Sequence, residues 1–143
     1  MEELKIAVRY FSKSGNTKKL ADVIAKTSGC KTEKIPEPLN DYVDVLFLGA
    51  SVYWGGISSE VKKYIKSLDR SKVGRVVVFS TSALAERALP EIKKYLQERK
   101  IKVDSNSFYC RGEFTALHKG RPNSDDLRAA AKFTKHVLEG KRA

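Results

Sequence analysis

Two runs of mostly apolar residues, 43–49 and 73–79, limit the folds open to this chain more than any other feature. The first reads VDVLFLG and the second reads VGRVVVF. A strand with one face in water alternates apolar and polar side chains, whereas nearly continuous apolar runs of this length are typical of strands buried on both faces. Both runs therefore predict internal strands of a sheet that is covered on either side.

Segments with helical spacing of apolar residues alternate with the predicted strands. Further strands are expected at residues 4–11, 30–35 and 104–110, the second of them a polar strand suited to a sheet edge. Four apolar stripes at helical spacing begin at Thr17, Val61, Leu89 and Leu127. The order β-α-β-β-α-β-α-β-α predicts an α/β fold with a parallel five-stranded sheet between two layers of helices. A chain of 143 residues has the size of one domain, so we expect a single domain over residues 1–143.

The predicted topology also indicates where a ligand would bind. In open parallel sheets, ligands bind beyond the carboxyl ends of the strands, at the point where the strand order reverses. The segments that follow the carboxyl ends of the predicted strands are residues 12–17, 50–56, 80–83 and 111–123. We therefore searched these four segments for a site.

The first of these segments has the composition of a phosphate-binding turn. It consists of Ser12, Lys13, Ser14, Gly15, Asn16 and Thr17, and it leads directly into a predicted helix. The first turn of a helix presents unpaired N–H groups and a positive dipole, to which three hydroxyl groups and an amide would add donors. The alternative is an ordinary helix cap, but a cap needs one hydroxyl and this turn offers three. The segment is neither a Walker loop nor a G-x-G-x-x-G turn, and it favours a phosphate monoester.

Charge and composition restrict the remaining choices. The net charge is +11, but no helix-turn-helix, zinc-finger or RNA-binding signature accompanies it, so a nucleic-acid partner is not favoured. The spacing of Cys30 and Cys110 fits neither a metal site nor a redox pair, and we expect two free thiols, no metal ligands and no catalytic nucleophile. No apolar stretch is long enough to span a membrane, and the start of the chain does not resemble a signal peptide. We therefore expect a cytoplasmic protein.

Three stretches resemble the flavodoxin family. SKSGNT after the first strand is similar to the family's phosphate loop, T/S-x-T/S-G-N-T. LFLGASVYWGGISSEVKKYI resembles its third strand, second flavin loop and following helix, and GRPNSDDLRAAAKF resembles the segment before the last helix in some flavodoxin-like proteins. The resemblance covers nearly the whole chain. It implies a flavodoxin-like three-layer fold with strand order 2-1-3-4-5, and FMN as the cofactor.

The same resemblance suggests how FMN would be held. Its phosphate would lie in residues 12–17. Its ring would lie against the second loop, which contains Ser51, Val52, Tyr53, Trp54 and Gly55. The third loop would offer backbone groups to the polar edge of the ring, from Ser80, Thr81, Ser82 and Ala83.

A redox function follows from this assignment, because the flavin itself carries the chemistry. We expect an FMN-binding protein that transfers electrons to or from a partner protein or a small organic molecule. The chain departs from the family in two ways: it is basic where flavodoxins are acidic, and the loop after the fourth strand, STSALAERALP, contains no aromatic residue. These departures keep two alternatives open. One is a small FMN-dependent oxidoreductase that acts on a quinone or, like the flavodoxin-like protoporphyrinogen oxidases, on a porphyrinogen. The other is a basic binding module without flavin.

Overall fold

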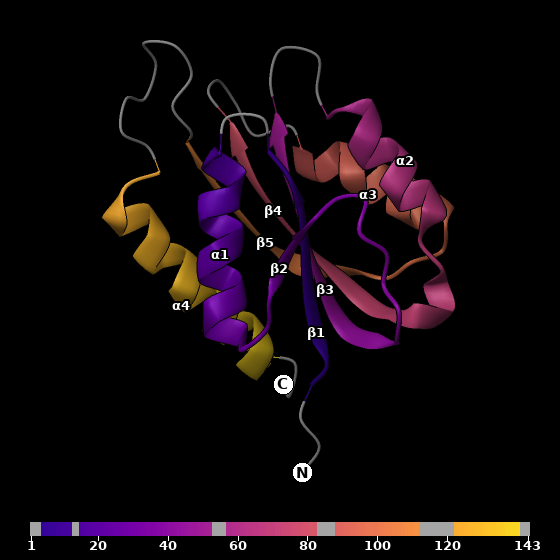
Figure 1. Ribbon diagram of the computed structural model, residues 1–143, viewed down its shortest axis with the longest axis horizontal. Coiled ribbons are helices and arrows are strands. Elements are labelled where there is room, and N and C mark those ends of the chain that lie inside the picture. Colours follow the sequence, from indigo (N-terminus) through magenta and orange to yellow (C-terminus); the bar gives the residue numbers. More distant parts are fainter. Residues whose placement is uncertain (1–3, 13–14, 53–56, 83–87, 112–121, 141–143) are drawn as a thin grey trace.

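Strands and helices alternate along the chain in the predicted order (Figure 1). The computed structural model describes residues 4–12, 15–52, 57–82, 88–111 and 122–140. The elements are β1 (Ile6–Phe11), α1 (Asn16–Ser28), β2 (Thr32–Lys34), β3 (Val43–Val52), α2 (Ser59–Ser67), the short 3-10 helix η1 (Arg70–Lys72), β4 (Val73–Ser82), α3 (Ala88–Glu98), β5 (Val103–Arg111) and α4 (Ser124–Gly140).

The strands form one five-stranded sheet in the order β2-β1-β3-β4-β5. Every neighbouring pair is parallel. The predicted fold class and strand order are therefore confirmed. The short polar strand β2 lies at an edge of the sheet, as its composition indicates, and β5 forms the other edge.

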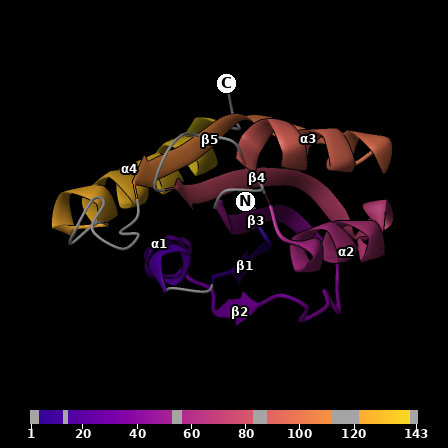
Figure 2. The same cartoon turned by 90° about the horizontal axis from the view of Figure 1, so that it is seen from above.

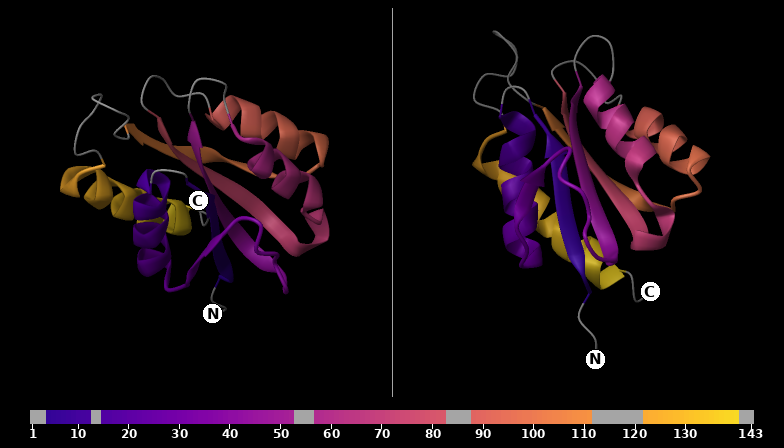
Figure 3. Two further views of the ribbon diagram at one scale, coloured as in Figure 1. Left: turned by 45° about the horizontal axis from the view of Figure 1, so that its top comes forward. Right: turned by 45° about the vertical axis from the view of Figure 1, so that its right-hand side comes forward.

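Helices cover both faces of the sheet, α1 and α4 on one and α2 and α3 on the other (Figures 2 and 3). Strand β3 supplies side chains to both cores, because alternate residues point to opposite faces. Leu46 and Leu48 belong to the core under α2 and α3, whereas Val45 and Phe47 belong to the core under α1 and α4. All four are buried, so the apolar run that suggested a doubly covered strand is explained.

The helix ends follow the local sequence. Gly29 ends α1 with φ of 79°, a left-handed conformation that glycine adopts without steric cost. At the start of α4, the Asn123 side chain accepts a hydrogen bond from the Asp126 N–H (3.0 Å), and the Asp126 carboxylate accepts one from the Asn123 N–H (2.8 Å). This reciprocal arrangement is a capping box, and it fixes the start of α4.

The cysteines lie near opposite edges of the sheet. Cys30 precedes β2 and Cys110 lies in β5, and neither forms a disulfide bond. Burial raises the pKa of the Cys30 thiol above its ordinary value. The expectation that the two cysteines do not pair with each other is confirmed.

Gly49 is required by close packing across the sheet. It pairs with Phe79 in the β3–β4 register, and a Cβ atom at this position would lie 2.3 Å from two carbon atoms of the Phe79 ring. Phe79 is fully buried and has little room to move. We expect Gly49→Ala to lower the free energy of unfolding by about 2–3 kcal/mol, measured by urea denaturation.

A second substitution tests whether the Phe79 ring is the cause. Phe79→Leu removes the atoms that the new methyl group would meet, at its own cost in buried apolar surface. The double variant Gly49→Ala/Phe79→Leu should therefore lose less stability than the sum of the two single variants. Strictly additive losses would show that Gly49 is constrained by something other than this ring.

Candidate functional site

The carboxyl ends of the strands meet at one end of the molecule, at the top in Figure 1. The chain leaves β1 for α1 on one face of the sheet and leaves the neighbouring strand β3 for α2 on the other face. The strand order therefore reverses between β1 and β3. Ligands of open parallel sheets bind at such a reversal. The predicted phosphate turn follows β1, so it lies at the position expected for a ligand site.

The described part of that turn is arranged around its backbone. The Ser12 hydroxyl accepts a hydrogen bond from the Gly15 N–H (2.9 Å) and keeps its own hydrogen to donate. Gly15 has φ of 91° and is the N-cap residue of α1, so the N-cap position has no side chain. The N-terminus of a helix is suited to an anion. Asn16 and Thr17 are 8% and 0% exposed, so these two residues lie below the protein surface.

A pair of buried hydroxyl groups connects this turn to β4. Thr17 Oγ1 lies 2.8 Å from Thr81 Oγ1, and Ser80 and Thr81 are each 2% exposed. The sequence suggested a role for the backbone of Thr81 but not for its hydroxyl. Two threonines 64 positions apart give no local signal of contact, and their pairing depends on how α1 packs on the sheet.

Two expected loops are in part strand, which corrects the prediction from sequence. Residues 50–52 and 80–82 were expected to be loops, but they extend β3 and β4 and pair with each other. The ladder continues on the other side of β4, where Ser80 pairs with Tyr109 and Thr81 with Cys110. Because residues 80–82 have partners in both neighbouring strands, their backbone belongs to the sheet. The buried hydroxyls of Ser80 and Thr81 therefore distinguish this position.

The structure describes part of the predicted cofactor site. It brings together Ser12, Gly15, Asn16, Thr17, Ser80 and Thr81 at the carboxyl end of the sheet. The backbones of Ser51, Val52 and Ser82 lie beside this group in the register of β3 and β4. Lys13, Ser14, Tyr53, Trp54, Gly55 and Ala83 lie outside the described residues.

The two charged residues that follow the turn directly in sequence are exposed lysines, Lys18 and Lys19. Lys18 forms an ion pair with Asp22 one turn along α1, at 2.9 Å, and the hydrogen bond to this carboxylate raises the Lys18 pKa above its ordinary value. Lys19 is exposed. Within the described ranges, no group of His, Cys, Asp and Glu side chains is placed to hold a metal ion. The donors at this end of the sheet are hydroxyl, amide and backbone groups, which suit a phosphate.

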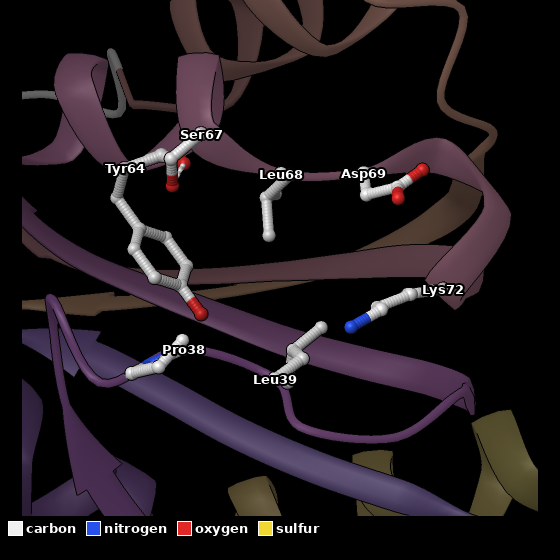
Figure 4. A pocket seen from close by; sticks show the side chains of 7 residues that line it. All are labelled: Pro38, Leu39, Tyr64, Ser67, Leu68, Asp69 and Lys72. Atoms are coloured by element: carbon white, nitrogen blue, oxygen red, sulfur yellow. Dashed lines mark hydrogen bonds between the residues drawn. The ribbon is translucent and has the colours of Figure 1, made fainter.

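A pocket of about 220 Å³ lies elsewhere, between α2 and the segment before β3 (Figure 4). The polar groups of Tyr64, Ser67 and Asp69 in its lining already have hydrogen-bond partners within the protein. The Tyr64 hydroxyl donates to the Glu37 carbonyl (3.0 Å), and the Asp69 carboxylate accepts from the Ser71 N–H and hydroxyl. Burial raises the Tyr64 pKa. This pocket is remote from the strand ends, and we do not assign the candidate site to it.

Among the described residues, no helix is long and apolar enough to cross a membrane.

Comparison with known proteins agrees with the fold. The model of the flavodoxin domain matches residues 7–115, and the chain belongs to this family. An uncharacterized protein of Methanocaldococcus jannaschii is 24% identical over 142 residues, covering 87% of this chain and 91% of that protein.

Solved structures show the same architecture. A flavodoxin from the domain Archaea has a TM-score of 0.77 at 16% identity, covering 98% of this chain and all of that one. The oxidised flavodoxin 2 of Bacillus cereus has a TM-score of 0.70 at 19% identity, covering 97% and 99% of the two chains. Together with the family match, these likenesses identify the chain as flavodoxin-like in fold.

Proposed function

We propose that the protein binds FMN without a covalent bond and transfers electrons as a flavodoxin does. The observation that supports this most directly is the N-terminus of α1, which follows Gly15 at the reversal of strand order and lies beside the paired hydroxyls of Thr17 and Thr81. This set of donors fits a phosphate group, and FMN is the flavin that ends in a phosphate. Bound FMN would supply the redox chemistry.

The residues of this chain would hold and orient the cofactor. The Ser12 hydroxyl would donate to the phosphate while it still accepts from the Gly15 N–H. In the threonine pair, Thr81 would donate to Thr17, and Thr17 would turn its own hydrogen to the phosphate. The depth of Thr17 would keep water from this contact and strengthen it.

The absorption spectrum of the purified protein tests this proposal. Protein that has been expressed and purified without added flavin should be yellow and show the two visible bands of oxidised flavin. Heat-released flavin should be identified as FMN by chromatography. A colourless protein that remains colourless after incubation with FMN would contradict the proposal and leave a binding module without flavin as the better account.

A small FMN-dependent oxidoreductase is the second candidate. It is favoured by the segment after β4, where residues 83–90 contain no aromatic residue that could cover the ring. The two functions differ in the molecule that exchanges electrons with the flavin. Oxidation of NAD(P)H by a quinone, or oxidation of a porphyrinogen by a quinone, at rates that exceed those of free FMN, would favour the enzyme, whereas exchange of electrons with a redox protein alone would favour the carrier.

A further inference from the structure

The positive charge of the chain is concentrated on one face. The α2–α3 face, defined here as residues 58–72 and 88–102, carries ten Lys and Arg residues and four Asp and Glu residues. The helices on the opposite face, residues 16–28 and 124–140, carry six Lys and Arg residues and four Asp and Glu residues. The net charge of the α2–α3 face is therefore +6 and that of the opposite face is +2, out of a total of +11 for the chain.

In the part of the chain that the structure describes, most cations of the α2–α3 face have no carboxylate within ion-pair distance. Lys62 is the one cation of this face that pairs with a carboxylate among the described residues, with Nζ 3.6 Å from Glu91, and it also lies over the Tyr95 ring. Lys63, Lys66 and Lys94 are exposed. On the opposite face, two of the six cations are paired within their own helices, Lys18 with Asp22 and Arg128 with Asp125.

The α2–α3 face begins beside the candidate FMN site. Helices α2 and α3 lie side by side, and their first turns are at the carboxyl end of the sheet (Figures 1 and 3). Lys62 and Lys63 lie where the first turn of α2 passes into the second, and Lys93 and Lys94 lie in the second turn of α3. At the far end of the same face, an open hollow of about 510 Å³ includes Arg70, Arg99 and Lys100 in its lining.

The composition of this face suits a protein better than a nucleic acid. Glu60, Glu91 and Glu98 are interspersed among the cations, and they would repel an evenly charged phosphate backbone. A folded acidic protein can present carboxylates to the lysines and avoid the glutamates. Tyr42, the exposed large hydrophobic residue of the described chain, lies outside this face. The contact would therefore be electrostatic, rapid and short-lived, as electron exchange between proteins requires.

We propose that the α2–α3 face is the docking surface for an acidic redox protein. This inference depends on the proposed function, because it assigns a partner to the same redox site. In each encounter one electron leaves the reduced centre of the partner and one electron enters the bound flavin. The partner is oxidised by one electron, the flavin is reduced by one, and no covalent bond forms between the proteins.

Two matched triple variants test the surface. Lys63→Glu/Lys66→Glu/Lys94→Glu reverses charge on the α2–α3 face, and Lys31→Glu/Lys132→Glu/Lys135→Glu reverses the same number of exposed lysines elsewhere. Each Lys→Glu change lowers the net charge by two units, so either triple variant takes the net charge from +11 to +5. The FMN-loaded variants are mixed in a stopped-flow instrument with a reduced [2Fe–2S] protein of strongly negative net charge, at several salt concentrations.

The expected result is a difference between the two triples. At low salt, the second-order rate constant of the α2–α3 variant should fall about tenfold or more, and that of the control triple about threefold or less. Added salt should slow the native protein and bring all three rates together. Equal losses in both triples would mean that overall charge steers the encounter, and unchanged rates would mean that this face is not used. Either result overturns the proposal.

Two further measurements separate this proposal from the others. Visible absorbance reports FMN binding in every variant, so a failure to bind flavin contradicts the proposed function and not the docking surface. In that case, binding of the oxidised acidic protein, followed by its NMR signals, should still be weakened more by the first triple. Tighter binding to a short DNA duplex than to the acidic protein, lost in the same triple, would overturn the proposal in favour of a nucleic-acid surface.

Discussion

Replacing Thr17 with valine is expected to weaken the binding of FMN by roughly one to two powers of ten. A hydrogen bond to a charged group contributes about 1.5–3 kcal/mol, and each 1.4 kcal/mol corresponds to about tenfold in affinity. Valine has nearly the shape of threonine, so the change removes the hydroxyl at this fully buried position and little else. The measurement is a fluorescence titration of the flavin-free protein with FMN.

Three controls show whether the hydroxyl acts on the phosphate. Riboflavin lacks the phosphate, so its affinity should be nearly the same in Thr17→Val and the native protein. Thr17→Ser should restore most of the affinity for FMN. Thr81→Val should also weaken FMN, by a smaller factor, because Thr81 holds the Thr17 hydroxyl at 2.8 Å. Equal losses for FMN and riboflavin would assign Thr17 to the stability of the site and not to the phosphate.

Replacing Arg9 with methionine should lower the free energy of unfolding by about 2–4 kcal/mol. Arg9 is only 8% exposed, although it lies in β1. Its Nε donates to the Glu37 carbonyl (2.9 Å), and its two terminal nitrogens donate to the carbonyls of Pro38 (3.0 Å) and Val8 (3.1 Å). Methionine would fill part of the volume but would remove all three hydrogen bonds, and the Glu37 carbonyl would keep only the one from Tyr64. Urea denaturation measures the loss.

Lys5, which directly precedes β1 and lies four residues before Arg9, provides a matched control. Its side chain is exposed, so Lys5→Met should change stability by about 0.5 kcal/mol or less. Arg9→Lys should recover little, because an ammonium group cannot reach three carbonyls in the way that a planar guanidinium does. Similar small losses at both positions would show that the contacts of Arg9 do not hold residues 37–38 against the sheet.

The sequence was sufficient to predict the sheet but not the length of its strands. The apolar pattern of β3 and β4 ends at Gly49 and Phe79, and the prediction placed the loops there. The ladder continues for three more residues in each strand, because backbone pairing does not depend on apolar side chains. The hydroxyls of Ser80 and Thr81 are buried in this extension, and the cost of burying Thr81 is offset by its contact with Thr17.

The candidate site was predicted in outline from one short segment. A hydroxyl-rich turn before a helix has a local signature, and the structure places Ser12 and Gly15 in a turn that leads into α1. Arg9 has no such signature. A charged residue in an inner strand is puzzling until the segment before β3 is seen to fold back over it. Contacts of this kind depend on the path of a distant segment, which local patterns do not specify.

A paired titration tests most sharply whether the carboxyl end of the sheet binds FMN through the phosphate group. Flavin-free native protein is titrated with FMN and, separately, with riboflavin, and the quenching of flavin fluorescence is followed. One FMN should bind per chain, at least tenfold more tightly than riboflavin. Riboflavin lacks the phosphate, and the loss of even one charge-assisted hydrogen bond to it lowers the affinity by about this factor. Equal affinity for the two flavins, or no binding of FMN, would contradict binding through the phosphate.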